Sequence, residues 1–320
     1  MTLGRSLESA RPERWGVILA GGDGFRLRPL TRTIAGDDRP KQFCSVLGEE
    51  SLLDQTRRRA GLLIRPSRTL VALTRCHERF YAPLVAETGP DAVVVQPENR
   101  GTAPAILLAL LRVAARAPAA SVAVFPSDHF IYPESRFVGA VATVVRAAES
   151  LRDRLVLLGV RPDGPEPDYG WIFPGRELLD VSGRKVHAVR TFLEKPSAED
   201  ARAAREEGAL WNTMIMAGKV DTFWRLGWRY VPELMFRFES YVEAIGTPSE
   251  SAALASIYKE MPMRNFSSDL LQRARTEVAT LSLEEVVWSD WGRAERIRET
   301  LARLGKRPAW EERESLAIAG

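Results

Sequence analysis

The amino-acid sequence predicts an α/β protein with a mostly parallel sheet flanked by helices and a helical C-terminal extension. Short apolar runs alternate with stretches of helical periodicity through the first half of the chain. Strands that alternate with helices form crossover units, whose strands lie parallel in one sheet. After residue 162 the rhythm changes: further strand patterns come first, and the remainder is mainly helical, without a sharp change in composition. We therefore expect one domain over residues 15–305, with loose tails at residues 1–14 and 306–320.

The elements of the first half follow from the spacing of apolar residues. Helices are expected where apolar residues recur every three or four positions, and strands where short apolar runs end at turn residues. In chain order we expect a strand at residues 15–20, a helix at 51–63, a strand at 69–74, a helix at 77–87, a strand at 92–95, a helix at 102–116, a strand at 121–125, a helix at 134–150 and a strand at 155–160.

The second half is assigned in the same way. Two strands are expected on either side of a turn at residues 181–185, and a short helix and a further strand follow them. Helical spacing then dominates until one last strand and a closing helix. The expected ranges are strands at 169–173 and 186–193, a helix at 198–207, a strand at 210–216, helices at 220–227, 233–245, 250–260 and 268–275, a strand at 285–288 and a helix at 294–304.

The composition argues against several classes of protein. The 45 basic and 42 acidic side chains give a formal net charge of only +3, which disfavours a dedicated nucleic-acid binder but is compatible with anionic substrates. Two cysteines without paired spacing, Cys44 and Cys76, predict neither a disulfide scaffold nor a zinc ribbon. The polar start has no apolar signal core, and the apolar run at residues 103–111 is too short to span a bilayer. We expect a cytoplasmic protein without a membrane partner.

A glycine-rich loop follows the first expected strand. Gly21, Gly22 and Gly24 would let backbone N–H groups approach a phosphate. The loop is not a P-loop, and Leu27 stands where the dinucleotide fingerprint requires its third glycine. A glycine pair alone is equally compatible with a tight turn. Basic residues in and after the loop favour phosphate chemistry, which depends on positive charge.

These and later motifs resemble the sugar-1-phosphate nucleotidyltransferases, and among them the mannose-1-phosphate guanylyltransferases. The resemblance covers roughly residues 15–305 and rests on short motifs that occur in the family's order. It implies a Rossmann-like sheet with the nucleotide at the carboxyl ends of the parallel strands. The motifs are residues 19–27, 40–43, 97–106, 126–129, 169–172, 192–196, 211–213 and 288–292.

The resemblance also implies roles for individual residues. Catalytic charges are expected from Arg26, Lys41 and Lys195, and a Mg²⁺ ion is expected on Asp128 and Asp290. Without the resemblance, a helix or turn cap would be the better explanation of Asp128, and a cap of the helix near residue 294 is the alternative for Asp290. The residues expected to bind the sugar are Gly170, Glu194 and Asn212. The residues expected to bind the nucleotide are Leu19, Ala20, Gly21, Gly22, Gly24, Gln96, Arg100, Gly101, Thr102 and Ser127.

Several residues receive no chemical role. An ionised sugar phosphate needs no general base, so His129 is expected to be structural, and His77 and His187 are expected to be surface histidines. The helix that begins at Thr102 is expected to direct free N–H groups toward the anionic nucleotide. Some residues differ from those usual in the family, and these differences bear on base and sugar preference: Phe25, Gln96, Gly101, Met214 (usually glycine) and Trp291 (usually valine).

The expected reaction is the transfer of a nucleotidyl group from GTP to mannose-1-phosphate, giving GDP-mannose and pyrophosphate. Three alternatives stay open. The same chemistry could use another base or sugar, as in a thymidylyl- or adenylyltransferase on glucose-1-phosphate or a heptose-phosphate guanylyltransferase. The chain could be a catalytically silent nucleotide-sugar-binding regulatory protein, or a nucleotide-binding oxidoreductase, which the missing third glycine disfavours. The helical C-terminal part would serve either as a homodimer surface or as a cover for the sheet.

Overall fold

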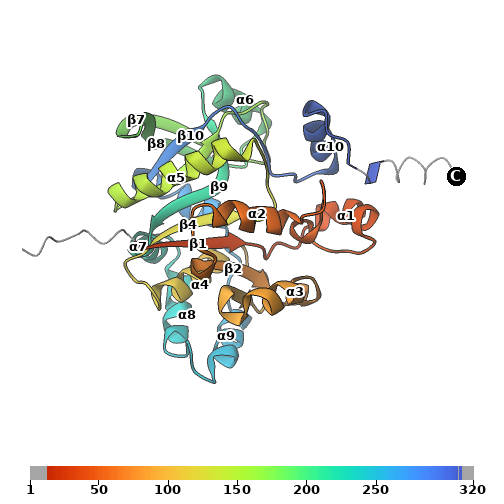
Figure 1. Ribbon diagram of the computed structural model, residues 1–320. Coiled ribbons are helices and arrows are strands. Elements are labelled where there is room, and N and C mark those ends of the chain that lie inside the picture. The colour runs from red at the N-terminus through yellow and green to blue at the C-terminus, as the bar shows by residue number, and fades with distance from the viewer. Residues whose placement is uncertain (1–12, 309, 312–320) are drawn as a thin grey trace, which may run out of the picture.

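The computed structural model describes residues 13–308 and 310–311 and is built around a nine-stranded sheet (Figure 1). The strand order is β3-β2-β1-β4-β9-β6-β10-β8-β7. The strands are β1 (Arg14–Leu19), β2 (Thr69–Thr74), β3 (Val93–Gln96), β4 (Ser121–Pro126), β6 (Leu155–Val160), β7 (Gly170–Val181), β8 (Arg184–Glu194), β9 (Leu210–Lys219) and β10 (Val278–Leu283).

Most strands of this sheet run in one direction, which confirms the expected α/β class. β1 pairs in parallel with β2 and β4, and β2 pairs in parallel with β3. β9 lies antiparallel between β4 and β6, and β10 is parallel to β6. Within the described chain only β9 and β8 run against the others. The carboxyl ends of β1, β4 and β6 therefore meet at one edge of the sheet.

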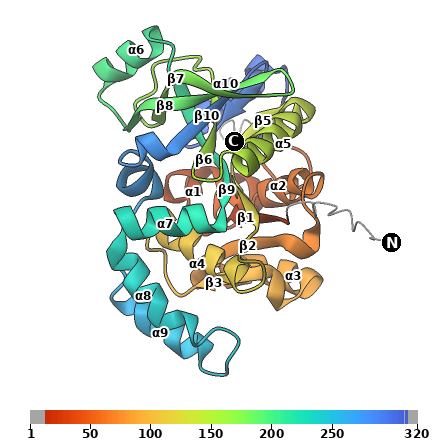
Figure 2. The ribbon, with the colours of Figure 1, turned by 90° about the vertical axis from the view of Figure 1, so that its left-hand side faces the viewer.

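Helices cover both faces of the sheet. One face packs against α4 (Thr102–Ala114) and α7 (Val220–Tyr230); α8 (Pro232–Val242) packs on these two helices and α9 (Glu250–Lys259) packs on α8, so that both extend the same core. The other face packs against α2 (Leu52–Gly61), α3 (Glu78–Thr88), α5 (Glu134–Ser150) and α6 (Ala198–Glu206). Figure 2 shows α8 and α9 at the opposite end of the molecule from α6 and the β7–β8 hairpin. A third, smaller core joins α1 (Arg28–Ala35) to α10 (Ala294–Arg303).

The apolar sequence of α4 explains its central place. Ten of its thirteen residues are buried, among them Ile106, Leu107 and Leu110, because the helix is apolar on nearly every side. A helix without a polar face is stable only inside a core. Its neighbours on that face come from α7 and α8, which are far along the chain.

The C-terminal part is less helical than the sequence predicts. β10 joins the main sheet between β6 and β8, and β11 (Val287–Ser289) pairs with β5 (Phe130–Tyr132). The helix expected at residues 268–275 is a π-helical turn at Phe266–Leu271, and the α1 helix was not foreseen. The strand pairing of β10 is with partners more than 80 residues away. Such pairings leave little local signal.

The expected loose tails need correction at their inner edges. Arg14 belongs to β1 and forms an ion pair with Glu149 at 2.8 Å. Trp310 is buried, and its indole nitrogen donates a hydrogen bond to the carbonyl oxygen of Val46 at 2.9 Å. The rest of both ranges, residues 1–12, 309 and 312–320, lies outside the described residues. No described helix combines the length and the apolar character that a membrane crossing demands.

Gly101 joins β3 to α4 in a backbone conformation that only glycine adopts readily. Its φ is 92°, and a Cβ atom there would lie 2.2 Å from the carbonyl oxygen of Arg264. Both the dihedral angle and the close approach of another backbone exclude a side chain.

We therefore expect Gly101→Ala to lower the free energy of unfolding by about 2 kcal/mol or more. Gly61→Ala is the control, because Gly61 ends α2 with open space around its Cα and should gain up to about 1 kcal/mol from helix propensity. Urea denaturation of the two variants measures the difference. Equal stability of both variants would contradict the assignment of Gly101.

Candidate active site

Three segments that carry the motifs meet at the carboxyl edge of the parallel strands. The glycine loop leaves β1 and Asp128 follows β4, and these strands end side by side, with Leu19 opposite Pro126. Asp290 follows β11, which is held beside β4 through its pairing with β5. Residues from distant parts of the chain thus form one cluster.

Lys41 connects these segments. Its side chain is 7% exposed, and its Nζ lies 3.2 Å from Oδ2 of Asp128. The same ammonium group donates to the carbonyl oxygen of Trp291 at 3.1 Å and also to that of Asp290. A buried cation requires partners of this kind. Lys41 therefore lies with the two aspartates rather than free in front of the glycine loop.

The carboxylate of Asp290 is fixed by several donors. Its Oδ1 accepts hydrogen bonds from the Tyr169 hydroxyl at 2.7 Å, the Gly292 N–H at 2.9 Å and Arg296 at 3.2 Å. Burial raises the pKa of Asp290, but the charge of Lys41 and these hydrogen bonds outweigh it and lower the pKa below its ordinary value. The carboxylate thus stays ionised, and its contribution to stability is lost only as the pH falls through that lowered pKa.

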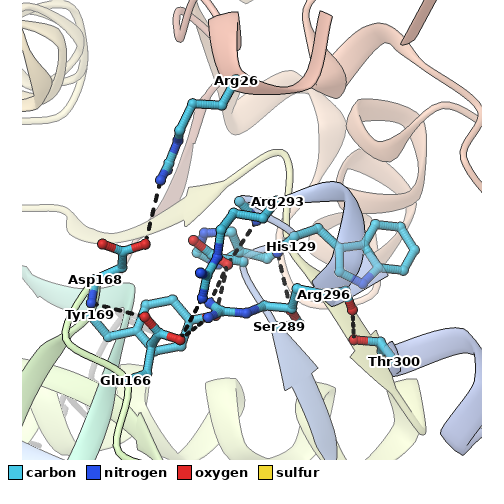
Figure 3. Close-up of polar contacts among 12 residues, drawn as sticks. Arg26, His129, Glu166, Asp168, Tyr169, Ser289, Arg293, Arg296 and Thr300 are labelled. Atoms are coloured by element: carbon cyan, nitrogen blue, oxygen red, sulfur yellow. Dashed lines mark hydrogen bonds and ion pairs between the residues drawn. The ribbon is translucent and has the colours of Figure 1, made fainter. Parts of the chain in front are cut away.

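A second layer of charges holds Arg296 in place (Figure 3). Arg296 lies on α10, stacks over the Tyr169 ring at 4.6 Å and donates to both the Tyr169 hydroxyl and Glu166. Glu166 also pairs with Arg293 at 2.9 Å. Because Arg296 is held from both sides, the helix α10 fixes the orientation of the Asp290 carboxylate.

The glycine loop is held from behind through its carbonyl groups. The Gln42 amide donates to the carbonyl oxygens of Ala20 at 3.0 Å and Gly22 at 2.8 Å, and the Thr74 hydroxyl donates to that of Gly21 at 2.9 Å. Arg26, in the turn after this loop, is mostly exposed and extends toward Asp168, whose carboxylate lies 3.6 Å away (Figure 3). An exposed cation at the mouth of the site suits a phosphate ligand.

The expected nucleotide segment at residues 96–102 is packed more tightly than the sequence suggests. Gln96 is buried and accepts a hydrogen bond from the Tyr258 hydroxyl at 3.2 Å. The Thr102 hydroxyl accepts from the Phe266 N–H at 2.8 Å.

One expectation about this segment is corrected. The Ala103 N–H, near the start of α4, is not free for an anionic nucleotide, because it donates to the carbonyl oxygen of Arg264 at 3.1 Å. Arg264 lies far along the chain from Ala103, so no local pattern could reveal this cap. Arg100 pairs with Glu98 at 2.9 Å, and Ser127 is buried at the end of β4.

The three residues expected to bind the sugar lie together. Gly170 on β7 is paired with Glu194 on β8, and a Cβ atom at Gly170 would lie 2.7 Å from Oε2 of Glu194 and 3.2 Å from Cβ of Asn212. Burial raises the pKa of Glu194, although the charge of Lys195 opposes this. Lys195 itself is exposed. Tyr169 links this trio to the aspartates, because its carbonyl oxygen accepts from the Lys195 N–H at 3.1 Å.

Two of the differences from the family's usual residues fall at left-handed backbone positions. Met214 has a φ of 58° and Trp291 a φ of 48°. Glycine is the residue that adopts such angles without strain, which agrees with the glycine that the family resemblance implies at the first position. The Met214 N–H donates to Oδ1 of Asn212 at 3.1 Å, and the Met214 side chain contacts Ser267. Met214 therefore borders the expected sugar site.

The histidines differ from one another in placement. His129 is largely buried, packs edge-on against Trp288 at 5.2 Å and has a pKa lowered by burial, consistent with its structural assignment. His77 is also buried, not on the surface as expected, and its Nε2 lies 3.3 Å from Oδ1 of Asp23 in the glycine loop. No local pattern signals this contact, because residue 77 lies in a different crossover unit.

The family model described as Nucleotidyl transferase matches residues 15–306. The chain belongs to the nucleotidyl transferase family. This match spans the glycine loop, both aspartates and the trio Gly170, Glu194 and Asn212, so the cluster at the sheet edge lies within the family's domain.

Individual relatives of this nucleotidyl transferase carry more specific names. It is 35% identical over 221 residues to the xanthan biosynthesis protein XanB of Xanthomonas campestris pv. campestris (strain B100), covering 68% of this chain and 43% of that protein. It is 32% identical to a mannose-1-phosphate guanylyltransferase of Sinorhizobium fredii (strain NBRC 101917 / NGR234), covering 86% and 52%. The chain thus spans about half the length of the curated relatives it matches.

A solved structure supports the same fold. A crystal structure described as mannose-1-phosphate geranyltransferase from Thermus thermophilus has a TM-score of 0.78 and 28% identity, covering 91% of this chain and 79% of that chain. The similarity confirms the α/β fold with a sheet flanked by helices.

Nucleotidyl transferases generally use a divalent metal ion, and the aspartate cluster fits one. Within the described residues, every hydrogen bond to the Asp290 carboxylate falls on Oδ1, which leaves Oδ2 for a cation. Asp128 is partly exposed, and its Oδ2 forms an ion pair with Lys41. Two carboxylates are the oxygen ligands that hard divalent cations prefer.

The structure adds two residues that the sequence reasoning left without a role. Tyr169 belongs to the motif at residues 169–172, but no role was given to it. Arg296 lies on the closing helix, outside every motif. Only their contacts with Asp290 indicate a positioning role. A tyrosine next to a motif glycine was the one available signal.

We expect Tyr169→Phe to weaken binding of Mn²⁺ by about 10- to 100-fold, because partners that orient a metal ligand have effects of this size. The change removes one hydroxyl and almost no volume. Calorimetric titration of the substrate-free protein with Mn²⁺ measures the affinity. Tyr230→Phe is the matched control, since Tyr230 donates to Glu277 away from the site. The same affinity in both variants would show that Tyr169 does not position Asp290.

Proposed function

We propose that this nucleotidyl transferase transfers the nucleotidyl group of GTP to mannose-1-phosphate, giving GDP-mannose and pyrophosphate. The observation that carries the proposal is the Lys41-linked pair of aspartates at the sheet edge, between the glycine loop and the Gly170–Glu194–Asn212 trio. The names of the guanylyltransferase relatives support the choice of substrates.

In this proposal the chain acts by positioning and by charge. The sugar-1-phosphate oxygen, already ionised at neutral pH, attacks the α-phosphorus of the triphosphate, and pyrophosphate leaves with the electron pair of the broken bond. Arg26 offers a cation to the triphosphate, and Lys195 aligns the attacking phosphate beside Glu194. Mg²⁺ held by Asp128 and Asp290 would supply positive charge against the phosphate oxygens. The protein's own contribution is orientation and preorganised electrostatics.

In this proposal Lys41 does not bind phosphate directly but holds the aspartates in place. Its ammonium group neutralises Asp128 and fixes the carbonyl groups at residues 290 and 291, so that both carboxylates keep one arrangement before substrates arrive. Preorganisation of this kind avoids rearrangement during the reaction. Nucleotide contacts would come from the loop residues Leu19, Ala20, Gly21, Gly22 and Gly24, with Gln96, Arg100, Gly101, Thr102 and Ser127 shaping the base and ribose side.

A second candidate function is the same chemistry with another sugar phosphate. Met214, where relatives carry glycine, borders Asn212 and changes the wall of the expected sugar site. Glucose-1-phosphate and heptose-1-phosphates are the alternative substrates in this second candidate function. We place either reaction in the cytoplasm, and synthesis of GDP-mannose belongs to the first proposal alone.

The first test is pyrophosphate release with Mg²⁺ and mannose-1-phosphate, run in parallel with GTP, ATP, dTTP and UTP. We expect release with GTP, because the chain shares its motifs with guanylyltransferases. Release with another triphosphate, or only with glucose- or heptose-1-phosphate, would keep the chemistry and replace the substrate. Protein that binds nucleotide yet releases no pyrophosphate with any pair would instead be a regulatory protein.

We expect Asp128→Asn and Lys41→Ala each to lower the rate of pyrophosphate release by about 100-fold or more, the size of effect seen when a charge-stabilising group is removed. Asp91→Asn and Lys219→Ala are controls of the same chemical type away from the site. Near-native turnover in both site variants, with folding confirmed by circular dichroism, would overturn the assignment.

A further inference from the structure

Asp23, Cys76 and His77 bring three different metal-binding groups together behind the glycine loop. One ligand atom from each residue lies within 4.8 Å of the other two. Asp23 is in the loop, whereas Cys76 and His77 lie in the short 3-10 turn Arg75–His77 after β2. This cluster is separate from Asp128 and Asp290, and the reaction proposed above does not use it.

The spacing of the three groups is close to that of a zinc site. With ordinary Zn–N, Zn–O and Zn–S bond lengths, tetrahedral ligands lie about 3.3 Å apart for oxygen and nitrogen and about 3.5 Å apart for oxygen and sulfur. Oδ1 of Asp23 lies 3.3 Å from Nε2 of His77 and 4.0 Å from Sγ of Cys76. A small rotation of the exposed Cys76 side chain would complete the geometry.

The surroundings orient the ligands as outer-shell partners do in metal sites. The other carboxylate oxygen of Asp23, Oδ2, accepts a hydrogen bond from the Asn99 amide at 2.8 Å, which leaves Oδ1 facing His77 and Cys76. The His77 ring is held edge-on against Phe43 at a centroid distance of 6.1 Å. Hydrogen bonds that fix a ligand's orientation strengthen metal binding.

The charges and access also suit a divalent cation. The His77 side chain is buried, and its Nε2 is directed at Oδ1 of Asp23, so this ring nitrogen faces the cluster. A carboxylate and a thiolate together balance a charge of +2. The exposed Cys76 gives solvent access to the cluster and a place for a fourth ligand, water, as in sites with three protein ligands.

We propose that Asp23, Cys76 and His77 form a zinc-binding site that fastens the glycine loop to the turn after β2. Binding releases the thiol proton of Cys76 to solvent, and the ion takes Oδ1, Sγ and a histidine nitrogen as ligands. The site would neutralise the carboxylate that the loop carries between Gly22 and Gly24, next to the expected position of the triphosphate. It is independent of the nucleotidyl transfer proposed above.

Co²⁺ provides a direct probe, because a cobalt–thiolate bond has a charge-transfer absorption that oxygen ligands do not produce. We expect the metal-free, reduced full-length protein to gain this band with one equivalent of Co²⁺ and to lose it when Zn²⁺ is added. Asp128→Asn should retain the band, which separates this site from the aspartate cluster. Cys76→Ser should lose it, whereas Cys44→Ala, at the buried second cysteine, should keep it.

A second readout uses alkylation of Cys76 by iodoacetamide, followed by mass spectrometry. We expect Zn²⁺ to slow alkylation of Cys76 by about tenfold or more in the wild type, as ligation removes the free thiolate, and much less in Asp23→Asn. Cys76→Ser and Asp23→Asn replace groups that are not fully buried, and their melting temperatures without metal show whether they fold. No thiolate band in the wild type, or a band that persists in Cys76→Ser, would overturn the proposal, as would equal alkylation rates with and without Zn²⁺.

Discussion

The buried ammonium group of Lys41 is the interaction on which the site depends. It pairs with Asp128 at the end of β4 and donates to the carbonyl oxygens of Asp290 and Trp291 after β11, so it joins the two aspartates that come from distant parts of the chain. Removing a cation from water is costly unless its partners replace the lost hydration. These partners are held at the ends of β4 and β11, and the arrangement is therefore stable only when both strands are in place.

A second constraint comes from the far end of the chain. Arg296 on α10 reaches back to Tyr169 and Asp290, and Glu166 holds Arg296 in turn. The small core between α1 and α10 includes Trp291, whose ring stacks on Phe130 at 4.6 Å. The last helix thus acts as part of the site, and packing in the third core is coupled to the geometry of the Asp290 carboxylate.

The two sides of the site differ in how they are built. The glycine loop presents its backbone and is held from behind by Gln42 and Thr74, whereas the proposed sugar side is formed by side chains on neighbouring strands, with Gly170 leaving room for Glu194 and Asn212. Backbone groups suit phosphate, which every triphosphate carries, and side chains suit hydroxyl patterns, which differ between sugars. Differences such as Met214 therefore fall where substrate preference would be decided.

The family resemblance, and not the local pattern, predicted the aspartate pair. The sequence pattern by itself determined the glycine loop and most strands and helices of the first half, though not α1. Local apolar periodicity and glycine position carry that information, because they reflect burial and backbone freedom of each segment. Only the tertiary structure decided that β10 joins the main sheet, that Arg264 caps α4, that His77 is buried against Asp23, and that Tyr169 and Arg296 hold Asp290. Nearly all of these contacts join segments that are far apart in the chain. The contact of Arg296 with Asp290 is local, but it depends on Tyr169, which is distant. The free energy of such contacts is gained only when the packed sheet brings the partners together.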